Sequence, residues 1–226
     1  METANKKDFV EVKFTGYTNG KVFDSNVEEE LKKLNPDDKP RELIVAVGEG
    51  MIVSGLDKAL EGKEIGKEYE VSITAKEGFG ERRKELVKTI PLKVFTEQKI
   101  SPYPGLVLAM DQSLARVVAV SGARVVTDFN NPLAGKDLVY KFRIVRKVSD
   151  DKEKAKTLFA FVFRFVPEFE VRDKIVVKGP KILENYIKAF SPKFKELMNK
   201  ELELEIVEPK KADEKAEETK ENAPNS

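Results

Sequence analysis

Short stretches in which every second residue is apolar recur along this chain, and they constrain its fold more than any other feature. Residues 10–14 and 69–73 alternate apolar with polar or charged side chains, and residues 138–142 do so except at Val139. This period of two is typical of strands that bury one face. Asn19-Gly20, directly after the first stretch, is a strong signal for a tight hairpin turn. The pattern predicts antiparallel sheet structure.

Helical spacing also occurs between these stretches. Leu56 and Leu60 predict a helix of about two turns that packing must stabilise. Ser54 is positioned to cap its start and Gly62 to end it. Sheets combined with separate helices favour an α+β fold.

The middle of the chain changes character after residue 80. Residues 81–88 are strongly charged, and three short strands are predicted after them, at 106–110, 115–120 and 123–126. Ser121-Gly122 joins the last two. The pattern predicts a small β-rich unit within the longer chain.

The C-terminal part predicts a further unit. Residues 150–156 have the composition of a charged linker, and the phenylalanines at every second position from Phe159 to Phe165 predict a strand. These phenylalanines are either the core of this unit or a surface that binds client chains. A strand at 169–177, a helix from Pro180 to about 197 that Pro192 can interrupt, and a strand at 202–206 are predicted to follow. From Pro209 on, the only apolar residues are three alanines, so this tail is predicted to be disordered.

Composition excludes several function classes. The chain has 41 Lys and Arg against 40 Asp and Glu, a net charge of +1, which argues against electrostatic capture of nucleic acid. It has no His and no Cys, which rules out Ser-His-Asp catalysis, thiolate nucleophiles and zinc–thiolate sites. We expect no cofactor and no metal site; Glu28–Glu30 can bind a divalent ion only weakly, and a solvated helix surface explains them better. No apolar run approaches the ~18 residues of a membrane span, and residues 1–8 lack a signal-peptide core. We therefore expect a cytoplasmic protein without membrane contact.

Several glycine-containing motifs occur in a fixed order. They occupy residues 12–16, 20–25, 47–56, 59–62, 78–80 and 131–138. This ordered set resembles the FKBP-type peptidyl-prolyl cis-trans isomerases. The long segment between Gly80 and Asn131 resembles the inserted flap domain of the SlyD-like branch, and the unit after residue 150 resembles the longer archaeal members.

The resemblance implies a half-open antiparallel sheet over one short helix, with an inserted β-rich flap domain and a C-terminal α+β domain. The implied boundaries are 1–83 plus 131–149 for the isomerase domain, 84–130 for the insert, 150–208 for the C-terminal domain and 209–226 for the charged tail.

The resemblance also implies an apolar pocket. Three residues are implied to act in catalysis: Asp24, Phe79 and Tyr140. Six more are implied to bind substrate: Phe14, Phe23, Leu43, Ile52, Val53 and Leu56. The Val53 N–H would anchor a substrate carbonyl, and Asp24 would place a negative charge near the twisting carbonyl carbon. The sequence pattern alone favours a turn-stabilising role for Asp24 and an ordinary core role for the apolar residues; the resemblance is what assigns them to a pocket.

Two positions depart from the family pattern. Phe79 replaces the usual Tyr, which removes a hydroxyl that contacts a substrate carbonyl. Asn131 replaces His in the motif Asn-His-Pro-Leu-Ala-Gly, and the His-rich metal-binding tail of some SlyD-like proteins is absent. Nickel delivery is therefore unsupported.

These observations predict a peptidyl-prolyl isomerase with chaperone activity, whose partners are unfolded or nascent polypeptides that contain proline. Rotation about an X-Pro bond breaks no bond, so a chain without His or Cys is able to catalyse it. The alternative is a holdase chaperone with a weak or inactive pocket, which Phe79 and the large share of non-catalytic chain would favour.

Overall fold

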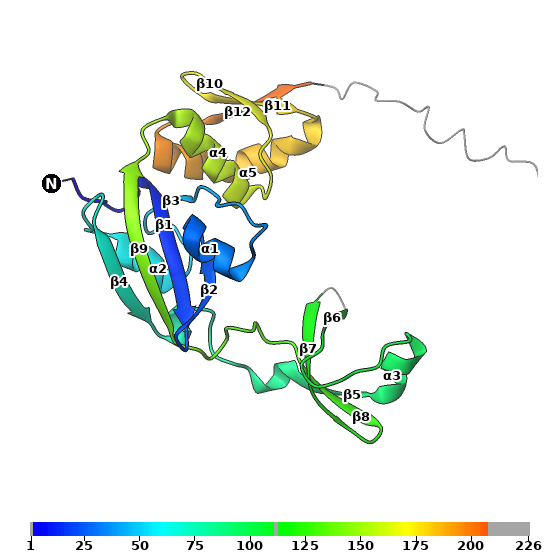
Figure 1. Cartoon of the computed structure of the whole chain (residues 1–226). Coiled ribbons are helices and arrows are strands. Elements are labelled where there is room, and N and C mark those ends of the chain that lie inside the picture. Colours follow the sequence, from blue (N-terminus) through cyan, green and yellow to red (C-terminus); the bar gives the residue numbers. More distant parts are fainter. Residues whose placement is uncertain (1, 111–112, 208–226) are drawn as a thin grey trace, which may run out of the picture.

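The computed structural model describes residues 2–110 and 113–207, and within them the strands form three separate sheets (Figure 1). The first sheet has five strands, in the order β2-β1-β9-β4 with β3 paired to β1. Its strands are β1 (Phe9–Thr18), β2 (Lys21–Ser25), β3 (Ile44–Ala46), β4 (Glu68–Ile73) and β9 (Leu138–Lys147). All pairs in it are antiparallel, as the period of two predicts.

The hairpin between β1 and β2 follows from its turn residues. Asn19 and Gly20 have φ angles of 50° and 72°, the positive values that a tight hairpin turn requires and that these two residue types tolerate best. The predicted hairpin is confirmed.

Helix α2 (Ser54–Leu60) packs against the concave face of this sheet, where Leu56 and Leu60 are buried. The predicted helix is confirmed, but the predicted cap is wrong. Val53 occupies the N-cap position, and no side chain accepts a capping hydrogen bond there. Ser54 is already the first helical residue, too late in the turn to cap it. Gly62, with φ of 75°, follows the end of the helix as predicted.

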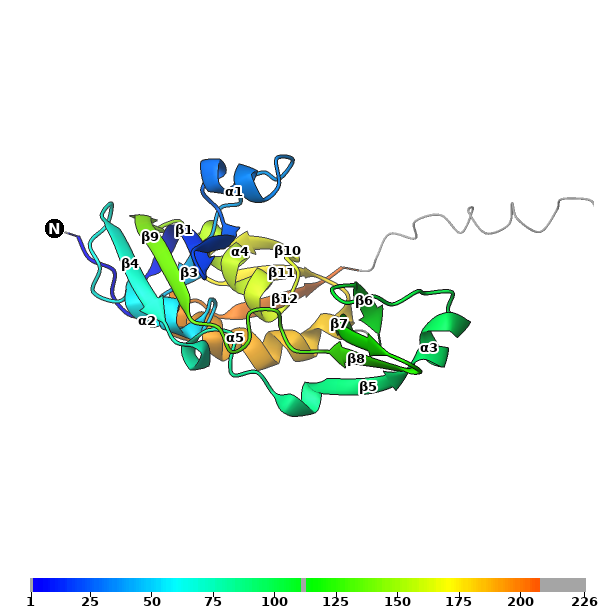
Figure 2. The same cartoon turned by 60° about the horizontal axis from the view of Figure 1, so that its bottom comes forward.

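Helix α1 (Glu28–Leu34) follows β2 and has no buried residue. It projects from the edge of the first sheet (Figure 2). Lys32 pairs with Glu28 at 2.6 Å and Lys33 with Glu30 at 2.7 Å, so the acidic cluster is a solvated helix surface with its own counterions. In the described residues, no group of three or more carboxylates is arranged to hold a metal ion.

The second sheet belongs to the segment between Gly80 and Asn131, and Figure 1 shows it standing apart from the other two. Its strand order is β5-β8-β7-β6. The elements are η2 (Lys84–Leu86), β5 (Val87–Pro91), α3 (Leu92–Glu97), β6 (Val107–Met110), β7 (Ser113–Ser121) and β8 (Arg124–Asp128). The short helix α3 was not predicted; its Phe95 is buried against Val117 and Val125 in a small core. One face of the sheet covers this core.

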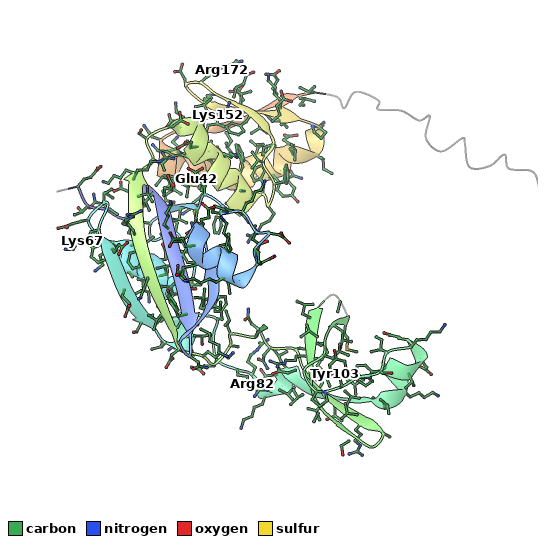
Figure 3. The ribbon with its side chains drawn as sticks, viewed as in Figure 1. Glu42, Lys67, Arg82, Tyr103, Lys152 and Arg172 are labelled. Carbon is green, nitrogen blue, oxygen red and sulfur yellow. The ribbon has the colours of Figure 1, made fainter. Side chains whose placement is uncertain are left out.

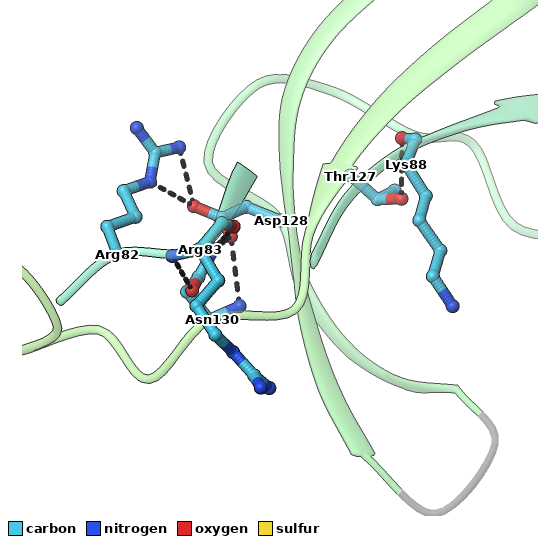
Figure 4. Close-up of polar contacts among 6 residues, drawn as sticks. All are labelled: Arg82, Arg83, Lys88, Thr127, Asp128 and Asn130. Carbon is cyan, nitrogen blue, oxygen red and sulfur yellow. Dashed lines mark hydrogen bonds and ion pairs between the residues drawn. The ribbon is translucent and has the colours of Figure 1, made fainter. Parts of the chain in front are cut away.

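Polar contacts hold the two ends of this segment together (Figure 4). The Arg82 guanidinium contacts the Asp128 carboxylate at 2.7 and 3.1 Å. The Asn130 side chain accepts from the Arg83 N–H and donates to the Arg83 carbonyl, each at 2.9 Å. The chain therefore enters and leaves the second sheet at neighbouring points.

The third sheet lies in the C-terminal part. Strand β11 is antiparallel to β10 and parallel to β12. The elements are α4 (Asp151–Val162), β10 (Glu168–Val171), β11 (Ile175–Gly179), η3 (Lys181–Leu183), α5 (Glu184–Met198) and β12 (Leu202–Ile206).

The strand predicted at Phe159–Phe165 and the linker predicted at 150–156 are both wrong, because helix α4 covers most of these residues. The Asp150 carboxylate accepts a hydrogen bond from the Glu153 N–H at 2.8 Å, which caps the helix. Burial follows helical spacing through Ala155, Leu158 and Phe159. The predicted strand rested on phenylalanines at every second position, which a strand would place on one face. In the structure only Phe159 and Phe163 of these are buried, and Phe165 is 46% exposed.

Two further C-terminal predictions need correction. The strand predicted at 169–177 is the hairpin β10–β11, which turns between Val171 and Ile175. Pro192 lies inside α5 and does not interrupt it. A proline removes one helical hydrogen bond, but Ile187 and Phe194 are buried on the same helix and keep it packed on both sides of the proline. The strand at 202–206 is confirmed.

The C-terminal elements share an apolar core with the first sheet. Phe9, Ala46 and Val148 from the first sheet are buried in one cluster with Leu158 and Phe194. This cluster lies where α4 and α5 cover the end of β3 in Figure 1. The C-terminal part is therefore packed onto the first sheet and not tethered to it by a linker.

Charged contacts reinforce this junction. The Arg146 guanidinium, at the end of β9, contacts Glu11 at 2.7 Å, Glu42 at 3.0 Å and Glu153 on α4 at 2.9 Å. Glu42 is labelled at this boundary in Figure 3. One guanidinium thus joins three separate segments.

Across residues 2–110 and 113–207, no helix is long and apolar enough to cross a membrane. The tail predicted to be disordered from Pro209 lies outside the described residues.

Candidate active site

The nine residues that the sequence singles out line one cavity of about 950 Å³ between the first sheet and α2. They are Phe14, Phe23, Asp24, Leu43, Ile52, Val53, Leu56, Phe79 and Tyr140. Leu43, from the variable loop near Pro40, is among them. Asp24 also lines the cavity, although its position after a turn allowed a purely local role.

Strand register brings the centre of this site together. Gly16 on β1 pairs with Asp24 on β2 and with Tyr140 on β9. Because neighbouring residues of paired strands share a face of the sheet, Asp24 and Tyr140 are brought close from positions 116 residues apart in sequence. The register of β1 against β2 shifts between Gly16 and Tyr17, and the pairing then continues to the hairpin turn.

Aromatic rings form one wall. The Phe23 ring meets Phe79 and Tyr140 edge-on, with centroids 6.2 and 5.7 Å apart, and Phe14 lies 5.9 Å from Tyr140. Such edge-to-face contacts are favourable and fix ring orientation. The cavity therefore has an apolar wall of three phenylalanines and one tyrosine.

Sequence reasoning assigned Gly16 only to a motif, and the structure gives its physical role. A Cβ on Gly16 would lie 2.6 Å from Phe23 Cζ and 3.0 Å from Tyr140 Cε1. No side chain fits there without moving a ring. A glycine inside an otherwise apolar strand was the signal available in the sequence.

Ile52 and Val53 reach the cavity from the loop between β3 and α2, which Asp57 holds. Asp57 is 5% exposed, and its two carboxylate oxygens accept the Gly48 N–H at 2.9 Å and the Gly50 N–H at 2.8 Å. A buried carboxylate with both oxygens bonded fixes the loop strongly. The sequence analysis did not identify Asp57 as a residue that holds this loop. The only signal in the sequence was an acidic residue directly beside Leu56, which the helical pattern predicts to be buried.

Asn26 was also missed. Its side chain accepts the Phe14 N–H and donates to the Val12 carbonyl, both at 2.8 Å. The Val12 N–H donates to the Leu43 carbonyl at 2.9 Å. Asn26 therefore ties the end of β2 to β1 beside the segment that presents Leu43.

Helix α1 and the loop after it extend the cavity beyond the predicted residues. Leu31 and Leu34 add an apolar surface, and charged residues surround it; these are Asp38, Lys39, Arg41 and Glu42. Leu34 is 43% exposed. The cavity therefore extends beyond the nine predicted residues, to an apolar surface with charged groups around it.

Burial, and secondarily the charge of Asp24, raise the pKa of Tyr140 to about 12. The phenol is therefore neutral and able to donate a hydrogen bond throughout the physiological range.

A second cavity of about 510 Å³ lies against the opposite face of the first sheet. Its side chains are mostly charged or polar, among them Lys13, Glu68, Glu70 and Arg143, and Phe14 is the one predicted residue it touches. The cavity over α2 fits the apolar pocket that the resemblance implies, whereas this second cavity, with its charged and polar side chains, does not.

Comparison with known proteins gives consistent results. A family model described as FKBP-type peptidyl-prolyl cis-trans isomerase matches residues 1–96, and one described as FKBP26, IF domain, matches 88–133. The short-type peptidyl-prolyl cis-trans isomerase of Methanocaldococcus jannaschii is 31% identical over 142 residues, which cover 62% of this chain and 90% of that protein.

Bacterial proteins named FKBP-type peptidyl-prolyl cis-trans isomerase SlyD are also similar. That of Haemophilus influenzae is 32% identical over 111 residues, 43% of this chain and 53% of the relative. That of Escherichia coli K12 is 32% identical over 101 residues, 43% and 52% respectively. The match therefore spans about half the length of these SlyD proteins.

Proposed function

Because the chain belongs to the FKBP-type peptidyl-prolyl cis-trans isomerases, we propose that it catalyses X-Pro isomerisation in unfolded or partly folded polypeptides. The observation that carries the proposal is the convergence of nine residues from six separate segments on one apolar cavity. A refolding assay limited by proline isomerisation, with the protein substoichiometric, tests it directly.

The reaction needs no group that changes its protonation state. The barrier of about 20 kcal/mol arises from amide resonance, which water strengthens by hydrogen bonding to the carbonyl. An apolar cup formed by Phe14, Phe23, Ile52 and Leu56 would desolvate the imide and favour the twisted, less polar transition state. Each ~1.4 kcal/mol of preference for that state increases the rate tenfold.

Three polar groups would orient the substrate. The Val53 N–H, at the N-cap of α2, would bind a substrate carbonyl, since the first N–H groups of a helix have no partner within it. The Asp24 carboxylate would act electrostatically near the twisting carbonyl carbon, and the neutral Tyr140 phenol would offer a hydrogen bond.

We expect the isomerase rate to be nearly independent of pH between about 6 and 9. Tyr140 stays protonated well above this range, because its pKa is raised to about 12, and the chain contains neither His nor Cys, the side chains that ordinarily titrate within it. The measurement is kcat/KM on a Pro-containing tetrapeptide across this interval. A sigmoidal or bell-shaped profile would show that a titrating group takes part.

Substitution of two cavity residues should alter the rate in opposite directions. Asp24→Leu should slow the reaction up to about tenfold by removing the charge. Phe79→Tyr should leave the rate equal or raise it, because a hydroxyl can be added at an open wall. Both variants should keep the melting temperature of the parent, and unchanged rates for both would contradict the assignment of the pocket.

We further propose that the chain is divided as its sequence implies. The isomerase unit is 1–83 with 131–149, the insert is 84–130, and the C-terminal unit is 150–208. The separate core of the second sheet and the match to an IF-domain model support the assignment of the insert.

Chaperone activity is proposed for the insert because several of its large apolar side chains are exposed, with Arg116 among them on the same sheet face. Val107 on β6 and Leu114 and Val118 on β7 are 56%, 67% and 45% exposed, and Tyr103, labelled in Figure 3, is 60% exposed. Exposed apolar residues that gather on one face are typical of surfaces that bind other chains. Strand β6 also lies at the edge of its sheet, where an extended client segment can pair.

The second candidate is a holdase with a weak or inactive pocket, which Phe79 in place of Tyr favours. Suppression of aggregation without catalysis of proline-limited refolding would support this candidate and overturn the first.

A further inference from the structure

The loop from Val47 to Val53 supplies Ile52 and Val53 to the cavity, and the C-terminal helix α5 contacts the same loop at Glu49, which does not line the cavity. The Lys193 ammonium forms an ion pair with the Glu49 carboxylate. The Glu49 side chain is only 8% exposed, whereas that of Lys193 is 33% exposed. A loop residue of the isomerase unit thus has its counterion in another unit of the chain.

The ion pair belongs to a short network. Lys193 also lies 3.3 Å from Glu196, and Glu196 lies 2.9 Å from Lys7, which precedes β1. The hydrogen bond to the Glu49 carboxylate raises the pKa of Lys193, so this ammonium stays charged at neutral pH. The network therefore joins α5 to two segments of the first unit.

Met51 makes the second connection. It packs against the core of the first sheet and against the core that α4 and α5 share with Phe9 and Ala46. Its sulfur accepts the Ala46 N–H at 3.2 Å. The residue directly before Ile52 is therefore held between the isomerase core and the C-terminal core.

We propose that the C-terminal unit positions the isomerase loop, with Lys193 as the positioning residue that acts through Glu49 on Ile52 and Val53. Asp57 fixes the loop from the α2 side, and Lys193 fixes it from the α5 side. Without Lys193, a nearly buried carboxylate loses its cation, and the loop must move to hydrate it. This inference rests on the proposed isomerase function.

The test is Lys193→Met in the full chain, which keeps the length of the side chain and removes the charge. We expect kcat/KM on a tetrapeptide to fall about fivefold. The matched control is Lys195→Met on the same helix, since Lys195 pairs at 2.5 Å with Glu201 inside the C-terminal unit. This control should keep the parent activity.

Rescue separates positioning from stability. Glu49→Gln added to Lys193→Met removes the uncompensated carboxylate, and we expect it to restore most of the activity. The backbone amide NMR signals of Ile52 and Val53 should shift in Lys193→Met, but not in Lys195→Met or in the rescued double variant. Parent activity in Lys193→Met, or a loss that Glu49→Gln does not repair, would overturn the proposal.

Two further outcomes are decided by the same measurements. If the parent protein lacked isomerase activity, the proposed function would fail, and the amide signals alone would decide whether Lys193 positions the loop. If Lys193→Met did not fold, Lys193→Gln would replace it, because it removes the same charge with a polar side chain; shifted Ile52 and Val53 signals are then expected, and unchanged signals would overturn the proposal.

Discussion

Replacing residues 84–130 with a short Gly-containing loop should slow catalysis of a proline-limited refolding reaction by about 100-fold, while a tetrapeptide is turned over nearly as before. The insert would hold an unfolded chain beside the pocket and raise the local concentration of its prolines, an advantage that a tetrapeptide does not need. The core should fold without the insert, because its two ends lie together. The Gly135 N–H donates to the Gly80 carbonyl at 2.8 Å, and Asn130 bonds both backbone groups of Arg83.

A point variant provides the matched control for this deletion. Leu114→Ser combined with Val118→Ser removes two exposed apolar side chains and leaves the buried Val117 in place. It should reproduce the selective loss on the refolding substrate, whereas Lys93→Ser on α3 should have no effect. Equal losses on both substrates would mean that the insert shapes the pocket. No loss on either would mean that it does not bind clients.

Gly16→Val should lower kcat/KM on every substrate by about 100-fold, equivalent to about 3 kcal/mol. The added Cβ would overlap the Phe23 ring at 2.6 Å and lie 3.0 Å from the Tyr140 ring, so the substitution would displace rings that line the cavity. Gly16 does not have a positive φ, so the effect would be steric and not a matter of backbone strain. The measurement is kcat/KM on a tetrapeptide, together with the melting temperature of the variant.

Gly179→Val is the control for Gly16→Val. A Cβ on Gly179, in β11, would lie 2.7 Å from Leu183 Cδ1, a comparable overlap far from the cavity. It should change stability and leave the rate unchanged. If Gly16→Val retained full activity in a folded protein, Phe23 would not be a wall of the substrate site.

Much of the isomerase unit could be predicted from local patterns in the sequence, whereas the nine cavity residues were named from the resemblance of its ordered motifs to the family. Asn19-Gly20 makes a turn that few other pairs allow, and the alternation around Val12 fixes which face of the strand is buried. Where function requires particular residues at particular turns, the order of motifs identifies the family.

The C-terminal unit was predicted less well because its pattern is ambiguous. Phenylalanines at every second position fit a strand, but Ala155, Leu158 and Phe159 have helical spacing, and the Asp150 cap selects the helix. The period of an apolar pattern decides between helix and strand only when the residues around it agree.

The sequence by itself determined the turns, the strand faces, the family and the residues of the cavity. The tertiary structure alone decided which of these residues touch. Gly16 must lack a side chain because two rings from other strands occupy the space where its Cβ would lie. Asp57 on α2 and Lys193 on α5 both hold the loop that precedes α2. Such contacts join positions as much as 144 residues apart, as for Lys193 and Glu49, and depend on shape and burial, which no local pattern of residue types encodes.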